Sequence, residues 1–222
     1  MTELALDIQE LDVAIAGTPI LRKVTLQLPQ GSMAGLIGRN GAGKTTLMRA
    51  VMGLLPSRSA TLACAGEAMS ELPAHTRAEH GISYLPEDRR LIPSLTVEEN
   101  ILLPAWANGL GDARQRLAWI YELIPELLEH RERKALQLSG GQQKLVALAR
   151  ALMPGRKLLL LDEPFEGVAP VLSRRLTEVI AKLRTEGLTV LLSESDDKHS
   201  ADLVDRIFRI ERGVVRESSA TH

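Results

Sequence analysis

The sequence has little cysteine and no long apolar run, and both absences limit what the protein can be. Cys64 is the only cysteine among 222 residues, so no disulfide can form within the chain and we expect a reducing compartment. We predict that Cys64 is a small buried apolar residue. No apolar run approaches the ~20 residues of a membrane-spanning helix. The segment from Met1 resembles no signal peptide, so we expect any membrane role to come through a partner.

Aromatic residues and excess charge are also scarce. Aromatics make up 3% of the chain and the net charge is -1. A near-neutral balance argues against a basic surface for nucleic acid, and we expect no nucleic-acid partner. The hydrophobic share of 45% and the charged share of 25% are ordinary for a globular protein. The length suits one sizeable domain, or one domain with a subdomain.

A glycine-rich stretch, GRNGAGKTT at residues 38–46, organises the chain. It follows the apolar run 33–37 and leads into a helical pattern at 46–52, which is the strand–loop–helix context of a phosphate-binding loop. The alternative is a glycine-rich turn that merely precedes a helix. In a phosphate-binding loop, backbone N–H groups close around an anion at the positive end of the helix dipole. The candidate nucleotide contacts are Gly38, Arg39, Asn40, Gly41, Ala42, Gly43, Lys44, Thr45 and Thr46.

Three of these side chains have expected roles. Lys44 should reach the β- and γ-phosphates, the Thr45 hydroxyl should bind Mg²⁺, and Thr46 should support an inner phosphate. The loop therefore predicts a nucleoside triphosphate with Mg²⁺, and the rest of the chain must indicate its use.

The periodicity elsewhere predicts an α/β fold. Alternating segments at 4–15, with a slip near its middle, and at 24–28 predict antiparallel strands before the loop, joined by a turn at 17–19. Further strands are expected at 60–65, 82–85, 158–161, 188–192, 207–210 and 214–216. Helical patterns cover about 96–133, where Pro125 should start, break or kink a helix, then about 142–152 and 170–184, with a short helix around Ala201.

An acidic pair follows the apolar run 158–161. Carboxylates at the carboxyl end of a buried parallel strand lie where ligands bind in open α/β sheets. Asp162 is expected to hold Mg²⁺ directly or through water, and Glu163 to polarise the water that attacks the γ-phosphate. The alternative is an ordinary solvated loop start.

The segment LSGGQQ at 138–143 is the most specific in the chain. Ser139 is a suitable helix N-cap. The two glycines that follow lower helix propensity, so they require another reason, such as an anion-accepting backbone.

Together, GRNGAGKTT, LSGGQQ and LLLLDEP resemble the ATP-binding subunits of ABC transporters, over nearly the whole chain. The resemblance implies a P-loop NTPase core with an antiparallel β subdomain, at about 1–86 and 154–222, and a helical subdomain at about 87–153. All of 1–222 would form a single ABC ATP-binding domain. It also implies a head-to-tail dimer, in which Ser139 and Gly141 of one subunit cap the γ-phosphate held by the other.

Other segments resemble the short ATPases of branched-chain amino acid importers: PEDRR at 86–90, LTVEEN at 95–100 and GVAP at 167–170. By this resemblance Glu87 occupies the position of a glutamine that senses Mg²⁺ and the attacking water. The helical subdomain should dock on a coupling helix of a membrane permease. Thr96 and Glu99 also predict a helix capping box, which is compatible with that role.

Three positions depart from the general ABC pattern. Ala16 replaces the aromatic residue that stacks on adenine, so we expect weaker ATP binding and looser base selectivity. Ala169 replaces an aspartate, as it often does in the importer subgroup. Ser195 replaces the switch histidine and should reach the γ-phosphate only closely or through water. We expect His199 to be a surface helix residue, Glu163 to carry catalysis, and Ser195 to assist.

The resemblance predicts an ATPase that couples ATP hydrolysis to import of branched-chain or related amino acids. Its expected partners are a permease, a second ATP-binding subunit (the same chain or, as the subgroup favours, a sister ATPase) and, indirectly, a periplasmic solute-binding protein. Its expected location is cytoplasmic, on the inner face of the cell membrane. Alternatives are an importer ATPase for urea, amides or small organic acids, an ABC ATPase working on DNA or ribosomes, and a weakly hydrolysing regulatory subunit. The net charge and the single cassette argue against the DNA or ribosome role. The intact Lys44, Asp162, Glu163 and Ser139 argue against the regulatory one.

Overall fold

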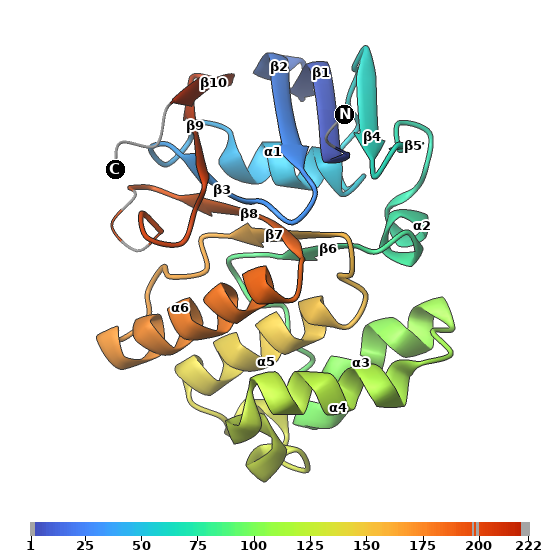
Figure 1. The fold of residues 1–222 in the computed structure, drawn as a ribbon, viewed down its shortest axis with the longest axis vertical. Helices are drawn as coiled ribbons and strands as arrows, with labels where there is room; N and C mark the ends of the chain where they lie inside the picture. The colour runs from blue at the N-terminus through green and yellow to red at the C-terminus, as the bar shows by residue number, and fades with distance from the viewer. Residues whose placement is uncertain (1–2, 197, 199, 219–222) are drawn as a thin grey trace.

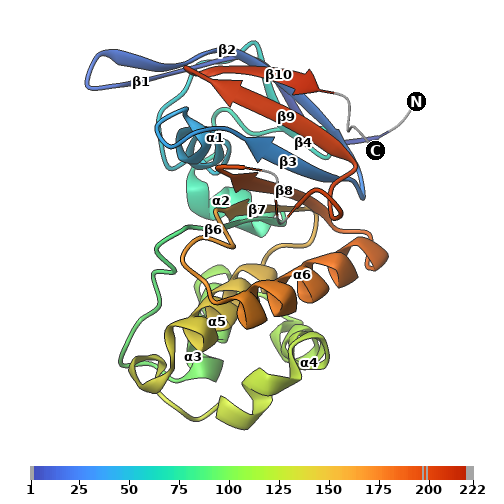
Figure 2. The same ribbon diagram turned by 90° about the vertical axis from the view of Figure 1, so that its left-hand side faces the viewer.

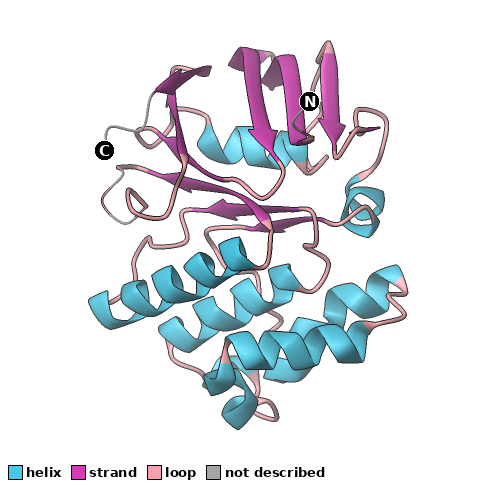
Figure 3. Cartoon of the chain, in the orientation of Figure 1, coloured by secondary structure: helices cyan, strands magenta, loops and turns pink. Residues whose placement is uncertain are grey.

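The computed structural model describes residues 3–196, 198 and 200–218, arranged as two sheets with helices between and below them (Figures 1 and 3). One sheet has four strands in the order β2-β1-β4-β5, and the other has six in the order β10-β9-β3-β8-β7-β6. The strands are β1 Leu4–Ile15, β2 Thr18–Pro29, β3 Met33–Ile37, β4 Thr61–Cys64, β5 Glu67–Ala68, β6 Ile82–Leu85, β7 Leu158–Asp162, β8 Thr189–Glu194, β9 Arg206–Glu211 and β10 Val214–Ser218. The helices are α1 Lys44–Val51, α2 Ala74–Glu79, α3 Val97–Asn108, α4 Ala113–Leu123, α5 Gly140–Leu152 and α6 Pro170–Thr185, with 3-10 helices η1 Pro125–His130 and η2 Ala135–Gln137.

The antiparallel strands before the phosphate loop are confirmed. β1 and β2 pair along their whole length, and the register shifts between Ile8 and Leu11. Such a shift is a β-bulge and explains the slip in the apolar alternation. The turn is shorter than predicted, because Thr18 and Pro19 already pair with Ile15 and Ala14.

The six-stranded sheet brings the phosphate loop and the acidic pair together. β3 pairs in parallel with β8, and β8 pairs in parallel with β7. The carboxyl ends of these three strands therefore lie side by side, with the end of β8 in the middle. β10 pairs antiparallel with β9 at the edge.

Helix α1 lies between the two sheets, while α5 and α6 cover the other face of the six-stranded sheet (Figure 2). The apolar run of β7 serves both faces. Leu158 and Leu160 belong to the core around α1, whereas Leu159 and Leu161 belong to the core under the helices. A continuous apolar strand is the expected sequence of a strand covered on both sides.

The segment between β6 and β7 is helical, as predicted, but it forms several shorter helices. The predicted helical stretch is divided into α3, α4 and η1, and Pro125 begins η1. The capping box of α3 is confirmed: Glu99 N donates to Thr96 Oγ1 at 3.1 Å, and Thr96 N donates to Glu99 Oε2 at 2.7 Å. Cys64 is buried, as predicted, at 1% exposure.

The predicted short helix around Ala201 is wrong. Residues 200–203 form a turn in which Leu203 N and Val204 N both donate to the carbonyl of Ser200. The chain then enters β9 beside β3, where Asp205 N donates to Met33 O, so too few residues remain for a helix. His199 lies outside the described residues.

Helix α2 was not predicted, because it is short and carries no apolar stripe. Its Arg77 is 4% exposed, and the guanidinium donates to the carbonyls of Ala50 and Val51 at the end of α1. The Ala50 carbonyl also accepts from Gly53 N, so Arg77 adds a second donor there and supplies a side-chain donor to the Val51 carbonyl at the end of the helix. Among the described residues no helix is both long and apolar enough to cross a membrane.

Candidate functional site

The phosphate loop joins β3 to α1, and glycine is required at two of its positions. Gly43, the N-cap of α1, has φ 114°, which L side chains rarely adopt. Gly38 lies so close to β9 that a Cβ would stand 2.3 Å from Ile210 O. The loop is thus held by a backbone that only these residues allow, and the amino end of α1 faces the cavity beside it.

A cavity of about 470 Å³ lies beside the loop. It brings together six residues of the loop with Glu87 and Glu163, whereas Gly38, Arg39 and Ala42 of the loop do not line it. Its lining is Ile20, Asn40, Gly41, Gly43, Lys44, Thr45, Thr46, Glu87, Glu163 and Glu166. Ile20 and Glu166 were not predicted, since Ile20 arrives only through the β1–β2 hairpin and Glu166 through the turn after β7.

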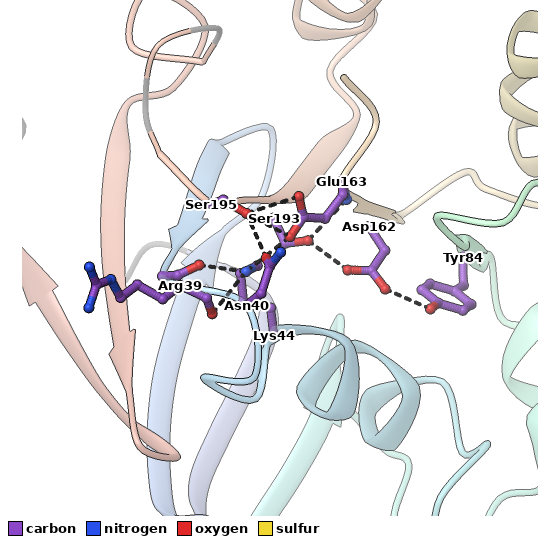
Figure 4. Close-up of polar contacts among 9 residues, drawn as sticks. Arg39, Asn40, Lys44, Tyr84, Asp162, Glu163, Ser193 and Ser195 are labelled. Carbon is purple, nitrogen blue, oxygen red and sulfur yellow. Dashed lines mark hydrogen bonds and ion pairs between the residues drawn. The ribbon is translucent and has the colours of Figure 1, made fainter. Parts of the chain in front are cut away.

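Lys44 lies at the centre of the site (Figure 4). Its ammonium donates to Gly38 O at 2.5 Å and Arg39 O at 3.3 Å, and forms an ion pair with Glu163 Oε1 at 3.0 Å. Both side chains are nearly buried, with Lys44 4% and Glu163 8% exposed. Each charge would be costly to bury alone, and the ion pair offsets part of that cost.

Glu163 is contacted from several sides. Its φ of 47° is left-handed, its N–H donates to Ser193 Oγ at 3.1 Å, and its carbonyl accepts from Lys144 Nζ at 3.1 Å. Ser195 Oγ lies 3.2 Å from Glu163 Oε1 and 2.8 Å from Asn40 Oδ1. Ser195 therefore bridges the phosphate loop and Glu163.

Lys144 is a contact that sequence reasoning missed. It is 1% exposed on α5, and burial lowers the pKa of its ammonium. Lys144, Leu148 and Leu152 are spaced four residues apart, so they share one face of α5. This spacing was the sequence signal available: it puts a lysine on the apolar face of the helix, and a buried lysine requires a hydrogen-bond acceptor.

Asp162 lies deeper than Glu163. It is fully buried and does not line the cavity. Oδ2 accepts from Tyr84 Oη at 2.9 Å and Oδ1 accepts from Ser193 Oγ at 2.7 Å (Figure 4). Burial and the charge of Asp162 raise the pKa of Tyr84, so this phenol remains a proton donor.

The oxygen donors around the cavity fit Mg²⁺. Thr45, Glu87 and Glu163 line it, and Asp162 lies behind them. Among residues that the structure describes, no group of three or more His, Cys, Asp or Glu could hold a metal by itself. This donor set suits Mg²⁺, which keeps several waters and is bound through few carboxylates together with nucleotide phosphates.

Ser139 and Gly141 do not join this cavity within one chain. Ser139 caps α5, as predicted: Gln142 N donates to its Oγ at 3.3 Å, and its N–H donates to Gln142 Oε1 at 2.9 Å. Gly141 also has a packing reason, because a Cβ would lie 3.0 Å from Leu172 Cδ2 of α6. Ala16 is exposed in the β1–β2 turn and does not line the cavity either.

The chain is similar to known proteins in both sequence and structure. The family described as ABC transporter matches residues 21–166. The high-affinity branched-chain amino acid transport ATP-binding protein BraG of Pseudomonas aeruginosa is 38% identical over 87% of this chain and 83% of its own. The lipopolysaccharide export system ATP-binding protein LptB of Escherichia coli is 34% identical over 92% of this chain and 86% of its own. An ATP-binding cassette of an ABC transporter, crystallised in its ADP conformation, superposes with a TM-score of 0.84 at 25% identity, covering 98% of this chain and 92% of that one.

Proposed function

Because the chain belongs to the ABC transporter family of ATP-hydrolysing subunits, we propose that its ATP hydrolysis drives import of branched-chain or related amino acids through a partner permease. The observation that carries the substrate class is the 38% identity to BraG over most of both chains. Transport in the export direction is the second candidate, and the 34% identity to LptB favours it.

The contacts within the site support different roles for Lys44, Glu163 and Ser195. Lys44 contacts Glu163 at 3.0 Å, and on ATP binding we propose that its ammonium turns to the β- and γ-phosphates. Glu163 then accepts the proton of the attacking water through the freed carboxylate oxygen. Ser195 fixes that carboxylate beside Asn40 of the loop.

Thr45, Glu87 and Asp162 are the residues that we propose for Mg²⁺. Thr45 and Glu87 line the cavity, whereas the deeper Asp162 suits contact through bound water. When bound, Mg²⁺ neutralises phosphate charge that develops during transfer of the γ-phosphoryl group. The loop residues 38–46 hold the phosphates through their backbone N–H groups.

We propose that the site is completed by a second subunit. Ser139 and Gly141 stand apart from the cavity of their own chain, and a head-to-tail pair would bring the same segment of a facing subunit onto the γ-phosphate. The amino end of α5 suits this role, since its free N–H groups and helix dipole attract an anion.

A groove beside the site suits the permease. It has a volume of about 330 Å³ and is lined by Glu87, Asp88, Arg89, Arg90, Leu91, Pro93, Ala135, Leu136 and Gln143. Leu136 is 74% exposed at its rim. Because Glu87 lines both the groove and the nucleotide cavity, a permease segment in the groove would be coupled directly to ATP.

The test combines co-purification with transport. A tagged chain is isolated from membranes, its permease is identified, and uptake of labelled leucine is measured in a deletion strain carrying wild type, Lys44→Ala or Leu136→Asp. We expect uptake with the wild type only, and loss of the permease with Leu136→Asp. Undiminished leucine uptake in the deletion strain, with an export permease co-purifying, would contradict the import proposal.

A further inference from the structure

The carboxylate of Asp162 is held by hydroxyl groups from the strands on both sides of β7. Tyr84 of β6 donates to Oδ2 and Ser193 of β8 donates to Oδ1, at 2.9 and 2.7 Å. The sheet order β8-β7-β6 makes this possible, because Ser193 is the register partner of Asp162 across β7 and β8. One hydroxyl thus reaches each carboxylate oxygen from opposite directions (Figure 4).

Ser193 also contacts the next residue. Its oxygen accepts the N–H of Glu163 at 3.1 Å while its own proton goes to Asp162. A single side chain therefore fixes the carboxylate of Asp162 relative to the backbone of Glu163, whose φ is left-handed at 47°.

A buried hydroxyl at this position has a cost unless its hydrogen bonds are made. Ser193 has 0% exposure and follows the apolar Leu191 and Leu192. Burying an unpaired hydroxyl is unfavourable, and here the Ser193 hydroxyl both donates and accepts a hydrogen bond. An apolar residue of similar size would fill the same space, so the hydrogen bonds are what a serine adds at this position.

We propose that Tyr84 and Ser193 are positioning residues, a hydroxyl clamp that aims the Asp162 carboxylate at Mg²⁺. This inference rests on the proposed ATPase site and deepens it. Each hydroxyl occupies one lone pair of one oxygen, which leaves the remaining lone pairs for Mg²⁺ or its waters. Partners that hydrogen-bond to a metal-binding carboxylate generally fix its orientation, which is the role assigned to these two hydroxyls.

The clamp predicts a loss of metal affinity that is separate from nucleotide affinity. Mn²⁺ serves as the probe: its binding to the ADP-loaded chain is measured by electron paramagnetic resonance, and ADP binding is measured separately in EDTA. Removing such a partner typically weakens metal binding by about 10-fold or more. We expect that loss in Ser193→Ala, a smaller loss in Tyr84→Phe, and ADP affinity within about twofold of wild type in both, because no contact of either hydroxyl reaches the phosphate loop.

Two further variants separate positioning from packing. Ser193→Thr keeps the hydroxyl, so it should restore most of the Mn²⁺ affinity lost in Ser193→Ala. Ser83→Ala removes another buried hydroxyl, 4% exposed, from β6. Because Ser83 precedes Tyr84 in the strand, its side chain faces the opposite side of the sheet, and we expect unchanged Mn²⁺ binding.

The outcomes distinguish the clamp from the proposed function. The clamp would be overturned, and the proposed function kept, if the wild-type chain hydrolyses ATP while Ser193→Ala and Tyr84→Phe bind Mn²⁺ as tightly as the wild type. Equal losses in Ser83→Ala and Ser193→Ala would also overturn it. Wild type that binds Mn²⁺ and ADP but never turns over ATP would instead overturn the proposed function.

Discussion

Glu163 combines a strained backbone with polar contacts from four other residues. Its left-handed φ of 47° is of a kind that costs about 1–3 kcal/mol when the surroundings impose it. Lys144 and Ser193 hold its backbone, and Lys44 and Ser195 hold its side chain. The strain is located where the carboxylate must be aimed at a reacting water, which agrees with its proposed role as general base.

Glu194 predicts a pH dependence of stability. Burial raises the pKa of its carboxyl to about 7, and the charges of Asp196 and Glu163 add to the rise. The folded chain therefore binds this proton more tightly than the unfolded chain, so the free energy of unfolding falls as pH rises from about 4.5 to about 7. At pH 8 the full cost is present, and Glu194→Gln should stabilise the chain by about 2–3 kcal/mol.

Urea unfolding at pH 5 and pH 8 checks this. The gain of Glu194→Gln over wild type should be large at pH 8 and small at pH 5. Glu129→Gln, an exposed position, is the control and should change stability little at either pH. A gain for Glu194→Gln that is independent of pH would contradict the prediction.

The residues of the phosphate loop could be predicted because their pattern is local in sequence. Tyr84 and Ser193 could not, since their contacts join residues far apart in the chain. Tyr84 is 78 positions from Asp162, and Ser193 is 31 positions from it. Only the order of strands in the sheet brings these groups together, and apolar periodicity carries no information about that order.

At the scale of elements, α3 and α5 begin in the same way. Each has a capping box, formed by Thr96 with Glu99 and by Ser139 with Gln142. Loss of such a cap costs about 1 kcal/mol. We therefore expect Thr96→Ala and Ser139→Ala to lower the free energy of unfolding by similar amounts, about 1 kcal/mol each.

The two caps should differ in function. Only Ser139 is proposed to contact the γ-phosphate of a facing subunit, so only Ser139→Ala should reduce ATP turnover strongly. Chemical denaturation and steady-state phosphate release are measured on both variants. Equal turnover in the two would show that Ser139 is a cap and nothing more.

The lengths of elements were harder to predict than their types. β2 runs from Thr18 to Pro29 because it pairs with β1 throughout, whereas local alternation marked only 24–28. α2 forms under the cover of Arg77, which binds the end of α1. In both cases tertiary contacts, absent from local sequence, decide where the element begins and ends.

At the scale of the whole molecule, one chain holds two halves of a site that do not meet. Lys44 lines the nucleotide cavity, and Ser139 does not. Under the proposed head-to-tail arrangement, the Lys44→Ala and Ser139→Ala variants should each be inactive alone. Mixed together, they should form pairs in which one of the two sites is intact.

Random pairing makes half of the pairs mixed, each with one intact site, so the mixture should recover about a quarter of wild-type turnover. ATP turnover by the wild-type chain alone would already require it to pair with itself. Wild-type turnover without recovery in the mixture would contradict a site shared between subunits.

The most direct test of the account is ATP turnover by Glu163→Gln, with Ser195→Ala beside it and ATP binding measured for both. A general base contributes about 100-fold or more, whereas one hydrogen bond of about 1 kcal/mol contributes about 5-fold. We predict a loss of at least about 100-fold in Glu163→Gln, about 5-fold in Ser195→Ala, and retained ATP binding in both. Near wild-type turnover in Glu163→Gln would contradict the account.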